Sequence, residues 1–323
     1  MSGKFGIPVA SVHALGSEFN QTFEVRATSG DRYVAKVFGR DDIDTVRWQH
    51  RLMDRIAEVG DVVVPHVLRD SEGRDICAAA AGPVICGYTW VDGAVIGNLP
   101  RHSVALLEDW GRTAGRVVRA LAGFAVDGAV QTHTWDLINA PDVIRRHVGD
   151  VPDETHRALV LGAVDLFERW VTPRIAELPK GVVHQDLNDF NVVVAGTGDA
   201  ARIAGVIDFG DAIYSTRVSE VAIAAAYAMQ RKDAPVEALT AVVRGYHGVV
   251  PLTGAEITTL YPLAVTRLAL NATVWTARRH GDNADYGRAR SEHTWNTLGR
   301  LTGEDAEAVA AKLHETLRRR ETT

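Results

Sequence analysis

The sequence predicts an α+β protein with two lobes, a small antiparallel β-rich lobe that holds one helix and a larger, mostly helical lobe. The chain has 323 residues, which is enough for about two domains of ~150 residues. Apolar and polar side chains alternate through much of the first hundred residues, whereas helical spacing dominates after about Pro100. We therefore expect an N-terminal lobe over residues 1–92 and a C-terminal lobe over residues 93–323.

The N-terminal lobe should contain a hairpin, one helix and further strands. Thr22–Thr28 and Arg32–Phe38 both alternate apolar and polar side chains, and a Ser-Gly-Asp turn joins them, which is typical of a β-hairpin. Asp41–Val59 has acidic residues in its first turn and apolar residues on one face, which predicts a helix. Val62–Leu68 and Asp75–Trp90 have the composition of strands.

The C-terminal lobe should be helical with a short strand pair inside it. Arg101–Leu121 and Asp153–Ile175 keep apolar residues at helical spacing. Lys180–Val194 and Ala201–Phe209 then return to strand character, and helices dominate from Arg217 onward. The polar residues with catalytic potential lie in these two inset strand segments.

Composition and charge argue against nucleic-acid and membrane partners for this chain. Lys and Arg number 35 and Asp and Glu 41, so the formal charge is −6, which argues against a broad nucleic-acid-binding surface. The apolar stretches are well short of the ~20 residues that span a bilayer, and no signal-peptide pattern is present. Two cysteines without zinc-ligand spacing indicate neither a disulfide scaffold nor a metal site. We expect a cytoplasmic protein without a nucleic-acid or membrane partner.

One cluster of polar residues has the pattern that phosphoryl transfer needs. Asp186 and Asn191 belong to a His-x-Asp-x-x-x-x-Asn motif after an apolar strand, and Asp208 opens an Asp-Phe-Gly sequence at the end of another. Transfer from a nucleotide requires one carboxylate to accept the proton of a hydroxyl, and an amide and a second carboxylate to hold Mg²⁺ on the phosphates. Oxygen ligands of this kind suit Mg²⁺ when phosphates complete its shell.

A lysine in the predicted hairpin fits the same chemistry. The chain has only five lysines, and Lys36 alone lies in the middle of an apolar strand. A strand lysine in this position contacts nucleotide phosphates in kinases. The following helix lacks a glutamate to hold it, but Gln49 lies on the inward face of that helix. We therefore predict that Gln49 is the polar neighbour of Lys36. The alternative is that Gln49 forms its hydrogen bonds with backbone groups instead.

These residues resemble the aminoglycoside phosphotransferase and choline kinase superfamily, the small-molecule kinases with a protein-kinase-like fold, and among them the hydroxylysine kinase branch is most similar. The resemblance implies that Asp186 is the catalytic base and that Asn191 and Asp208 bind Mg²⁺. It also implies that Lys36 contacts the α- and β-phosphates of ATP or GTP, and that residues 86–92 form a hinge against the purine.

The resemblance extends to further nucleotide-side positions. Trp90 lies in the implied hinge, and His184 would brace the catalytic loop. Ser17 and Asn20, just before the hairpin, could offer polar groups to phosphate oxygens, although an ordinary hairpin entry is the alternative.

Acceptor-binding groups should come from the helical lobe. An acceptor ammonium would need a carboxylate, for which Asp189, Asp211 and Asp136 are candidates, and an acceptor carboxylate would need an arginine such as Arg267. A helix cap or a surface ion pair is the alternative for each. Trp135, Trp275 and Trp295 could line a cation-accepting cleft, or could simply be core.

The leading interpretation is a nucleotide-dependent kinase that phosphorylates a hydroxyl of an amino alcohol or a hydroxylysine-like hydroxy amino acid. One alternative is an O-phosphotransferase for an aminoglycoside or cyclic peptide antibiotic. An alternative of another class is a catalytically inactive nucleotide-binding regulator, against which the joint presence of Asp186, Asn191, Asp208 and Lys36 argues. The identity of the acceptor, the choice of ATP or GTP and the oligomeric state stay open.

Overall fold

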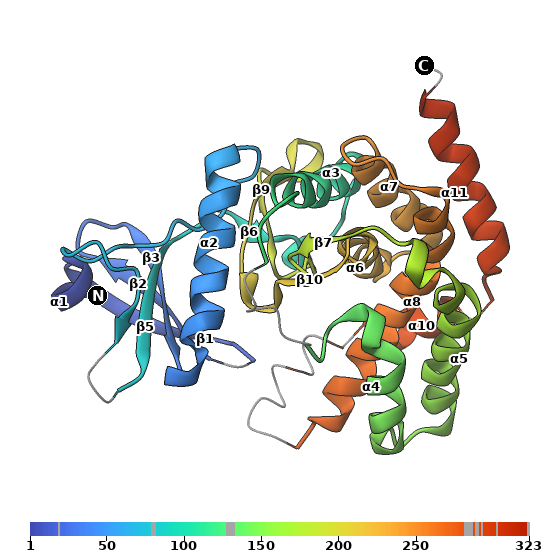
Figure 1. The fold of residues 1–323 in the computed structure, drawn as a ribbon, viewed down its shortest axis with the longest axis horizontal. Coiled ribbons are helices and arrows are strands. Elements are labelled where there is room, and N and C mark those ends of the chain that lie inside the picture. The colour runs from blue at the N-terminus through green and yellow to red at the C-terminus, as the bar shows by residue number, and fades with distance from the viewer. Residues whose placement is uncertain are drawn as a thin grey trace.

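The structure is a computed structural model that describes residues 1–18, 20–78, 82–126, 133–280, 287, 291, 293–301 and 303–321. It has the predicted α+β architecture, with an antiparallel N-terminal sheet and one long helix followed by a largely helical C-terminal part (Figure 1). Residues 90–93 connect the N-terminal sheet to a strand that pairs inside the C-terminal part, and the proposed lobe boundary falls in this connection.

The N-terminal sheet has the strand order β1-β2-β3-β5-β4, with every described pair antiparallel. The predicted hairpin is confirmed by the pairing of β2 with β3, and β1 is an additional strand that the sequence pattern did not predict. Val84–Thr89 pairs with the other edge of β3, and Cys86 lies opposite Lys36 in this pairing. The strands are β1 (Val9–Leu15), β2 (Gln21–Ala27), β3 (Arg32–Phe38), β4 (Cys77–Ala78) and β5 (Val84–Thr89).

The helix after β3 connects the two parts of the molecule. A short helix α1 (Ser2–Phe5) precedes the sheet, and α2 (Ile43–Val59) confirms the predicted helix after a short 3-10 turn. The side chains of Val46, Leu52 and Ile56 on its inward face are fully buried. Trp48 donates from Nε1 to the carbonyl oxygen of Ala212, 3.0 Å away in the C-terminal part.

The predicted strand over Val62–Leu68 is wrong. This segment is extended, but its one strand-like contact is an isolated bridge between Val67 and Tyr88. Pro65 lacks the N–H that a ladder requires. The carbonyl of Val63 instead accepts a hydrogen bond from the N–H of Val206, 2.9 Å away in the C-terminal part, so the segment joins the two parts rather than extending the sheet.

The inset strands form two small sheets rather than one pair. β7 (Lys180–Val183) pairs with β10 (Ile213–Thr216), and β8 (Val192–Ala195) lies between β6 (Ala94–Val95) and β9 (Arg202–Val206). The loop between β7 and β8 therefore meets the loop between β9 and β10. The N–H of Ile207 donates to the carbonyl of Asn191, 2.9 Å away, which joins the two loops.

Most helices of the C-terminal part lie on the side of these sheets that faces away from the N-terminal sheet (Figure 1). α6 is buried throughout, and α8 is buried over most of its length, which makes these two helices the centre of the core. The helices predicted over Arg101–Leu121 and Asp153–Ile175 are confirmed as α3 and α5, the latter followed by a 3-10 turn. The helices are α3 (Val104–Ala120), α4 (Ala140–His147), α5 (Glu154–Trp170), α6 (Val218–Met229), α7 (Pro235–His247), α8 (Gly254–Ala277), α10 (Thr294–Leu301) and α11 (Ala306–Glu321).

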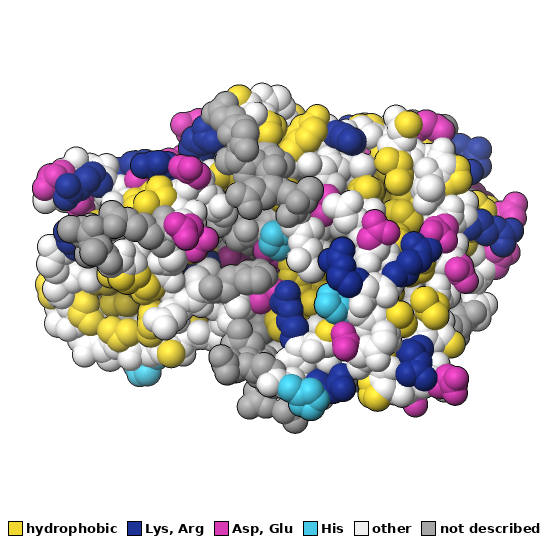
Figure 2. Space-filling model, turned by 60° about the horizontal axis from the view of Figure 1, so that its bottom comes forward, with side chains coloured by type: hydrophobic (Ala, Val, Ile, Leu, Met, Phe, Trp, Pro, Cys, Tyr) yellow, Lys and Arg dark blue, Asp and Glu magenta, His cyan; other side chains and the backbone are white. Residues whose placement is uncertain are grey.

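The surface has mixed charge. On the face shown in Figure 2, Lys and Arg side chains are interspersed with Asp and Glu over the helical part, the ordinary pattern for a surface in water. Within the described residues, no helix is both long and apolar enough to cross a membrane.

Two glycines let α3 and α7 pack with their backbones in contact. A Cβ atom on Gly245 would lie 1.9 Å from the carbonyl oxygen of Glu108, and one on Gly111 would lie 1.8 Å from that of Val242. We expect Gly245→Ala to lower the free energy of unfolding by at least about 1–3 kcal/mol, because the helices must separate. Urea denaturation would measure the change.

Gly162→Ala in α5 is the matched control, because a Cβ there would meet no atom within 4 Å. It should raise the free energy of unfolding by roughly 0.5–1 kcal/mol, since alanine favours a helix over glycine. Equal stability of Gly245→Ala and wild type would contradict the close packing of α3 and α7.

Candidate active site

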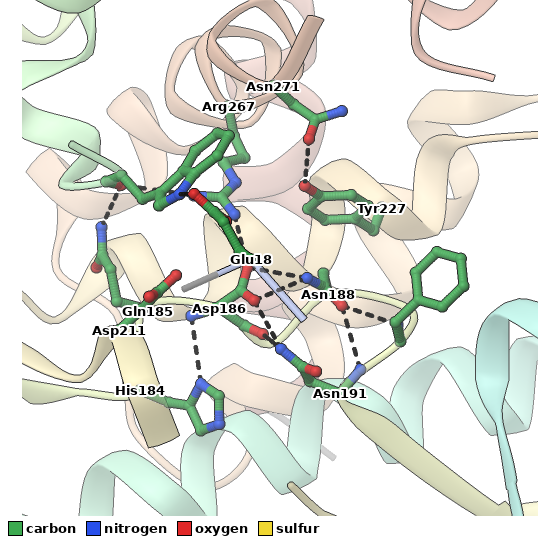
Figure 3. A network of polar contacts seen from close by, with 12 residues as sticks. Glu18, His184, Gln185, Asp186, Asn188, Asn191, Asp211, Tyr227, Arg267 and Asn271 are labelled. Carbon is green, nitrogen blue, oxygen red and sulfur yellow. Dashed lines mark hydrogen bonds and ion pairs between the residues drawn. The ribbon is translucent and has the colours of Figure 1, made fainter. Parts of the chain in front are cut away.

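The centre of the site is the carboxylate of Asp186, in the loop between β7 and β8 (Figure 3). Its Oδ1 accepts from Nη2 of Arg267 at 2.6 Å, and its Oδ2 accepts from Nδ2 of Asn191 at 2.6 Å. Asn188 donates from Nδ2 to both oxygens at 2.9 Å. Since a carboxylate accepts about four hydrogen bonds, these donors define its orientation almost completely. The side chain of Asp186 is 18% exposed, so a substrate can still reach the carboxylate.

His184 braces this loop, as the resemblance implied. Its Nε2 lies 3.0 Å from the carbonyl oxygen of Ile207, and its Nδ1 lies 3.3 Å from the N–H of Asp186. The first contact requires a donor and the second an acceptor, so the neutral imidazole satisfies both. Burial lowers the pKa of His184 to about 4, which keeps the ring neutral near pH 7. The ring therefore holds the loop of Asp186 against the strand that leads to Asp208.

Gln185 and Glu220 support the loop from behind. Gln185 adopts a left-handed backbone conformation with φ of 67°, which is strained for a residue with a side chain. Its N–H donates to Oε2 of Glu220 at 3.1 Å, and its side chain donates to the carbonyl of Trp135 at 3.0 Å. Both side chains are fully buried. These contacts fix the turn that presents Asp186.

Lys36 and Asp208 meet across the two parts of the molecule. Nζ of Lys36 lies 2.7 Å from Oδ1 of Asp208, which has a left-handed φ of 63°. Burial acts to raise the pKa of Asp208, but the Lys36 ammonium outweighs it and holds the pKa below its usual range. We expected Gln49 to be the polar neighbour of Lys36. The structure gives Lys36 a carboxylate partner in Asp208, and a contact between Lys36 and Gln49 stays a prediction.

A cavity of about 260 Å³ lies between the N-terminal sheet and the site. Its walls are mostly apolar, from β3 and β5 on one side and β8 on the other, which suits the flat face of a nucleobase. Ser17 and Asn20, which we predicted on the nucleotide side, are not among its described lining residues. The hydroxyl of Ser17 donates to Oδ1 of Asn20, 3.1 Å away. The predicted residues that do line it are Lys36, Gln49, Trp90, Asn191 and Asp208.

The residues predicted to bind Mg²⁺ fit that ion. Asn191 and Asp208 line the same cavity, and Nδ2 of Asn191 is committed to Asp186, so its amide offers an oxygen to a ligand. Hard oxygen ligands are those that Mg²⁺ prefers, with phosphates and water completing the shell. Within the described part of the chain, no group of three or more His, Cys, Asp or Glu side chains could hold a metal.

A second, much smaller pocket of about 30 Å³ opens on the other side of Asp186. We call it the polar pocket, and Figure 3 shows most of its residues. Trp135 and Trp275 form aromatic walls, with ring centroids 6.0 Å apart. The residues that line it are Glu18, Trp135, Asp186, Asn188, Asp211, Tyr227, Arg267, Asn271 and Trp275.

Only some of the predicted acceptor-side residues lie there. Asp211 and Arg267 line the polar pocket. Asp136 instead caps the 3-10 helix over Leu137–Asn139 and accepts from Ser215 at 2.9 Å. Asp189 is buried elsewhere, 3.9 Å from Arg231.

The aromatic candidates divide in the same way. Trp135 and Trp275 line the polar pocket as predicted, whereas the ring of Trp295 stacks on that of His156 at 4.1 Å. Sequence reasoning missed Glu18, Tyr227 and Asn271 as lining residues. Tyr227 lies in an apolar stretch that indicates core, and a glutamate in a loop carries no signal of the pocket that it reaches.

Asp211 is an acidic group of the polar pocket whose surroundings disfavour its ionised form. Burial raises its pKa well above the usual range, and the charges of Asp186 and Glu18 raise it further. His133 lies 3.4 Å away, but burial and the nearby Arg267 lower its pKa to about 4. The neighbouring imidazole is therefore neutral at pH 7 and does not compensate the carboxylate.

The larger cavity and the polar pocket are connected by the hydrogen bond from Asn191, which lines the first, to Asp186, which lines the second. Together with the similarities below, this arrangement is that of a small-molecule kinase, a phosphotransferase with an alcohol group as acceptor. Residues 11–256 match the phosphotransferase enzyme family (APH), and the chain belongs to that family.

Several known proteins are similar to this chain. Hydroxylysine kinase of Mus musculus is 24% identical, over 97% of this chain and 90% of the relative. Homoserine kinase of Methylobacillus flagellatus is 27% identical, over 76% and 72%. The solved structure of a microcompartment-associated aminopropanol kinase matches with a TM-score of 0.71 at 19% identity, over 94% of each chain. Solved structures with the same fold include complexes with ADP and with GDP.

Glu220 should make stability depend on pH. Burial raises its pKa from an ordinary 4.5 to about 8. Between these values the folded chain keeps a proton that the unfolded chain has lost, so the free energy of unfolding should fall as pH rises from about 4.5 to 8. We expect Glu220→Gln to reduce this fall by at least ~1.4 kcal/mol, the equivalent of one pKa unit.

Urea denaturation at several pH values would measure the effect. Glu58→Gln on the exposed side of α2 is the control and should follow the wild-type pH dependence. Parallel curves for wild type and Glu220→Gln would show that the carboxyl does not titrate in this range.

Proposed function

We propose that this chain transfers the γ-phosphate of a nucleotide to a hydroxyl of a small hydroxylated amine, an amino alcohol or a hydroxylysine-like hydroxy amino acid. The observation that carries the proposal is the position of Asp211, a buried acidic group with a neutral histidine beside it, in the same small pocket as Asp186. An acceptor ammonium bound there would stabilise the ionised form of Asp211. An acceptor ammonium at Asp211 would leave a nearby hydroxyl facing Asp186.

The aromatic walls and the relatives support this acceptor class. Trp135, Trp275 and Tyr227 line the polar pocket, and aromatic faces attract cations. Hydroxylysine, homoserine and aminopropanol, which name the similar kinases, each carry a hydroxyl and an amino group.

In this proposal the chain contributes mainly position and charge. Asp186 would accept the hydroxyl proton at a carboxylate oxygen while the acceptor oxygen attacks the phosphate in line. Lys36 would leave Asp208 to contact the inner phosphates, and Asn191 and Asp208 would hold the metal. Bound Mg²⁺ neutralises charge on the phosphates.

Removing the base should abolish most turnover. We expect Asp186→Asn to lower kcat by at least about 10²-fold, because general-base catalysis contributes ~10²–10⁴-fold. Nucleotide affinity, measured by calorimetry, should change little. Asp199→Asn in an exposed turn is the control and should keep wild-type kcat. An Asp186→Asn enzyme with near wild-type kcat would remove this residue from the mechanism.

Asp211 should determine preference for amines. Across a panel of hydroxylysine, homoserine, aminopropanol, ethanolamine and aminoglycosides, Asp211→Asn should raise the KM of the best amine about 10- to 100-fold, the equivalent of ~1.5–3 kcal/mol for a charged hydrogen bond. The KM of the nucleotide should not change.

The same variant should lose little activity toward an alcohol analogue that lacks the amino group. An equal loss for the amine and for this analogue would contradict ammonium recognition by Asp211. Turnover of aminoglycosides alone would favour the antibiotic kinase.

A further inference from the structure

Arg267 on α8 contacts the proposed base directly. Its Nη2 lies 2.6 Å from Oδ1 of Asp186, and its Nη1 lies 3.5 Å from the carbonyl oxygen of Trp135 (Figure 3). The residue is 2% exposed. This geometry differs from the role that the sequence suggested, which was to bind a carboxylate of the acceptor.

Two aromatic rings fix the guanidinium. Its Cζ lies 5.0 Å from the ring centroid of Trp135 and 5.7 Å from that of Tyr227. A planar guanidinium held between rings has few alternative orientations, and lysine cannot reproduce this contact. The direction of the Nη2 donor toward Asp186 is therefore determined by α6, α8 and the segment of Trp135.

The other donors to this carboxylate come from its own loop. Asn188 and Asn191 follow Asp186 by two and five positions, so they move with it. Arg267 lies 81 positions away on α8, which is buried over most of its length in the C-terminal part. Its hydrogen bond thus ties the carboxylate to the core of the molecule.

Charge makes this tie necessary. Glu18 and Asp211 line the same pocket as Asp186, and like charges at such range repel strongly when partly shielded from water. Arg278 pairs with Glu18, whereas Arg267 pairs with Asp186. Without Arg267, no cation of this pair would oppose the repulsion between Asp186 and its acidic neighbours, and only the donors of its own loop named above would hold the carboxylate.

We infer that Arg267 is a positioning residue that holds the Asp186 carboxylate toward the acceptor hydroxyl, and that it is not the group that binds an acceptor carboxylate. The inference rests on the proposed function, because it requires Asp186 to be the base. Helix α8 would then orient the catalytic base through the side chain of Arg267.

The test compares Arg267→Ala and Arg267→Lys with wild type. We expect Arg267→Ala to lower kcat about 10²-fold, the scale of a displacement of a reacting group by 1 Å, while both KM values stay within about 3-fold. Arg267→Lys should have an intermediate kcat, because it restores the charge but not the planar fork. A loss confined to the KM of the acceptor would overturn the inference and favour carboxylate binding.

Chemical rescue separates positioning from a general loss of structure. Guanidinium at low millimolar concentration should raise kcat of Arg267→Ala at least about 10-fold by occupying the space between Trp135 and Tyr227. Urea has nearly the same shape without the charge and should not rescue. Rescue by neither compound, or by both equally, would overturn the inference.

Arg217→Ala is the matched structural control. Arg217, which is half-buried, pairs with the fully buried Glu256 at 2.7 Å, away from the polar pocket. Its loss should lower stability without lowering kcat more than about 3-fold, and guanidinium should have no effect on its kcat. If Arg217→Ala loses kcat as Arg267→Ala does, loss of any buried ion pair explains both variants and the inference is wrong.

Slow hydrolysis of the nucleotide by water provides a readout without an amine. If wild type hydrolyses nucleotide but phosphorylates no amine, the acceptor class fails, whereas dependence of hydrolysis on Asp186 and Arg267 would still support the positioning role. If wild type shows neither activity, the proposed function fails and the inference with it. Undiminished hydrolysis by Arg267→Ala would overturn the inference alone.

Discussion

Two hydrogen bonds of one buried imidazole determine where the reactive groups of this protein lie. His184 binds the carbonyl of Ile207 on one side and the N–H of Asp186 on the other. β7 pairs with β10 and β8 with β9 in separate sheets, and this imidazole adds to the backbone hydrogen bond from Ile207 to Asn191 that joins their loops. The imidazole thus holds Asp186 at a fixed distance from Ile207, the residue before Asp208. Burial keeps the ring neutral, so that one nitrogen donates to Ile207 while the other accepts from Asp186.

Around this connection, each carboxylate of the site has a different environment. Asp208 pairs with Lys36, Asp186 with Arg267 and Glu18 with Arg278. Asp211 has a neutral histidine beside it. Because an opposite charge stabilises the ionised form of a carboxylate, Asp211 is the acidic group of the site whose ionised form these neighbours stabilise least, and its pKa is raised. A cationic acceptor, as proposed, would supply the missing opposite charge.

Local patterns in the sequence predicted the reactive residues but not their environment. Asp186, Asn191 and Asp208 fall in short motifs at strand ends, and the structure places them together with Lys36. The partner of Arg267 could not be predicted, because its contact with Asp186 joins segments 81 positions apart. Glu18 reaches Trp135 across 117 positions, with no periodicity or motif to mark it.

The fold shows the same limit. The hairpin of β2 and β3 and the long helices have clear periodicity, and they were predicted within a few residues. β1 is mostly exposed, so it lacks the alternation that marks a half-buried strand. Val62–Leu68 has a strand-like composition, but its Val63 carbonyl is used by Val206 of another sheet. Such errors reflect pairing between distant segments, which composition does not record.

Two residues of the segment between β1 and β2 contact different pockets. Gly16 lines the larger cavity, and Glu18, two residues later, lines the polar pocket and accepts a hydrogen bond from Trp135. If the larger cavity binds the nucleotide and the polar pocket the acceptor, as proposed, a change at one of these residues on binding would also alter the wall of the other pocket. Linkage would then require the two affinities to depend on each other by the same factor in both directions. Nucleotide binding and acceptor binding would thus be coupled through one short segment.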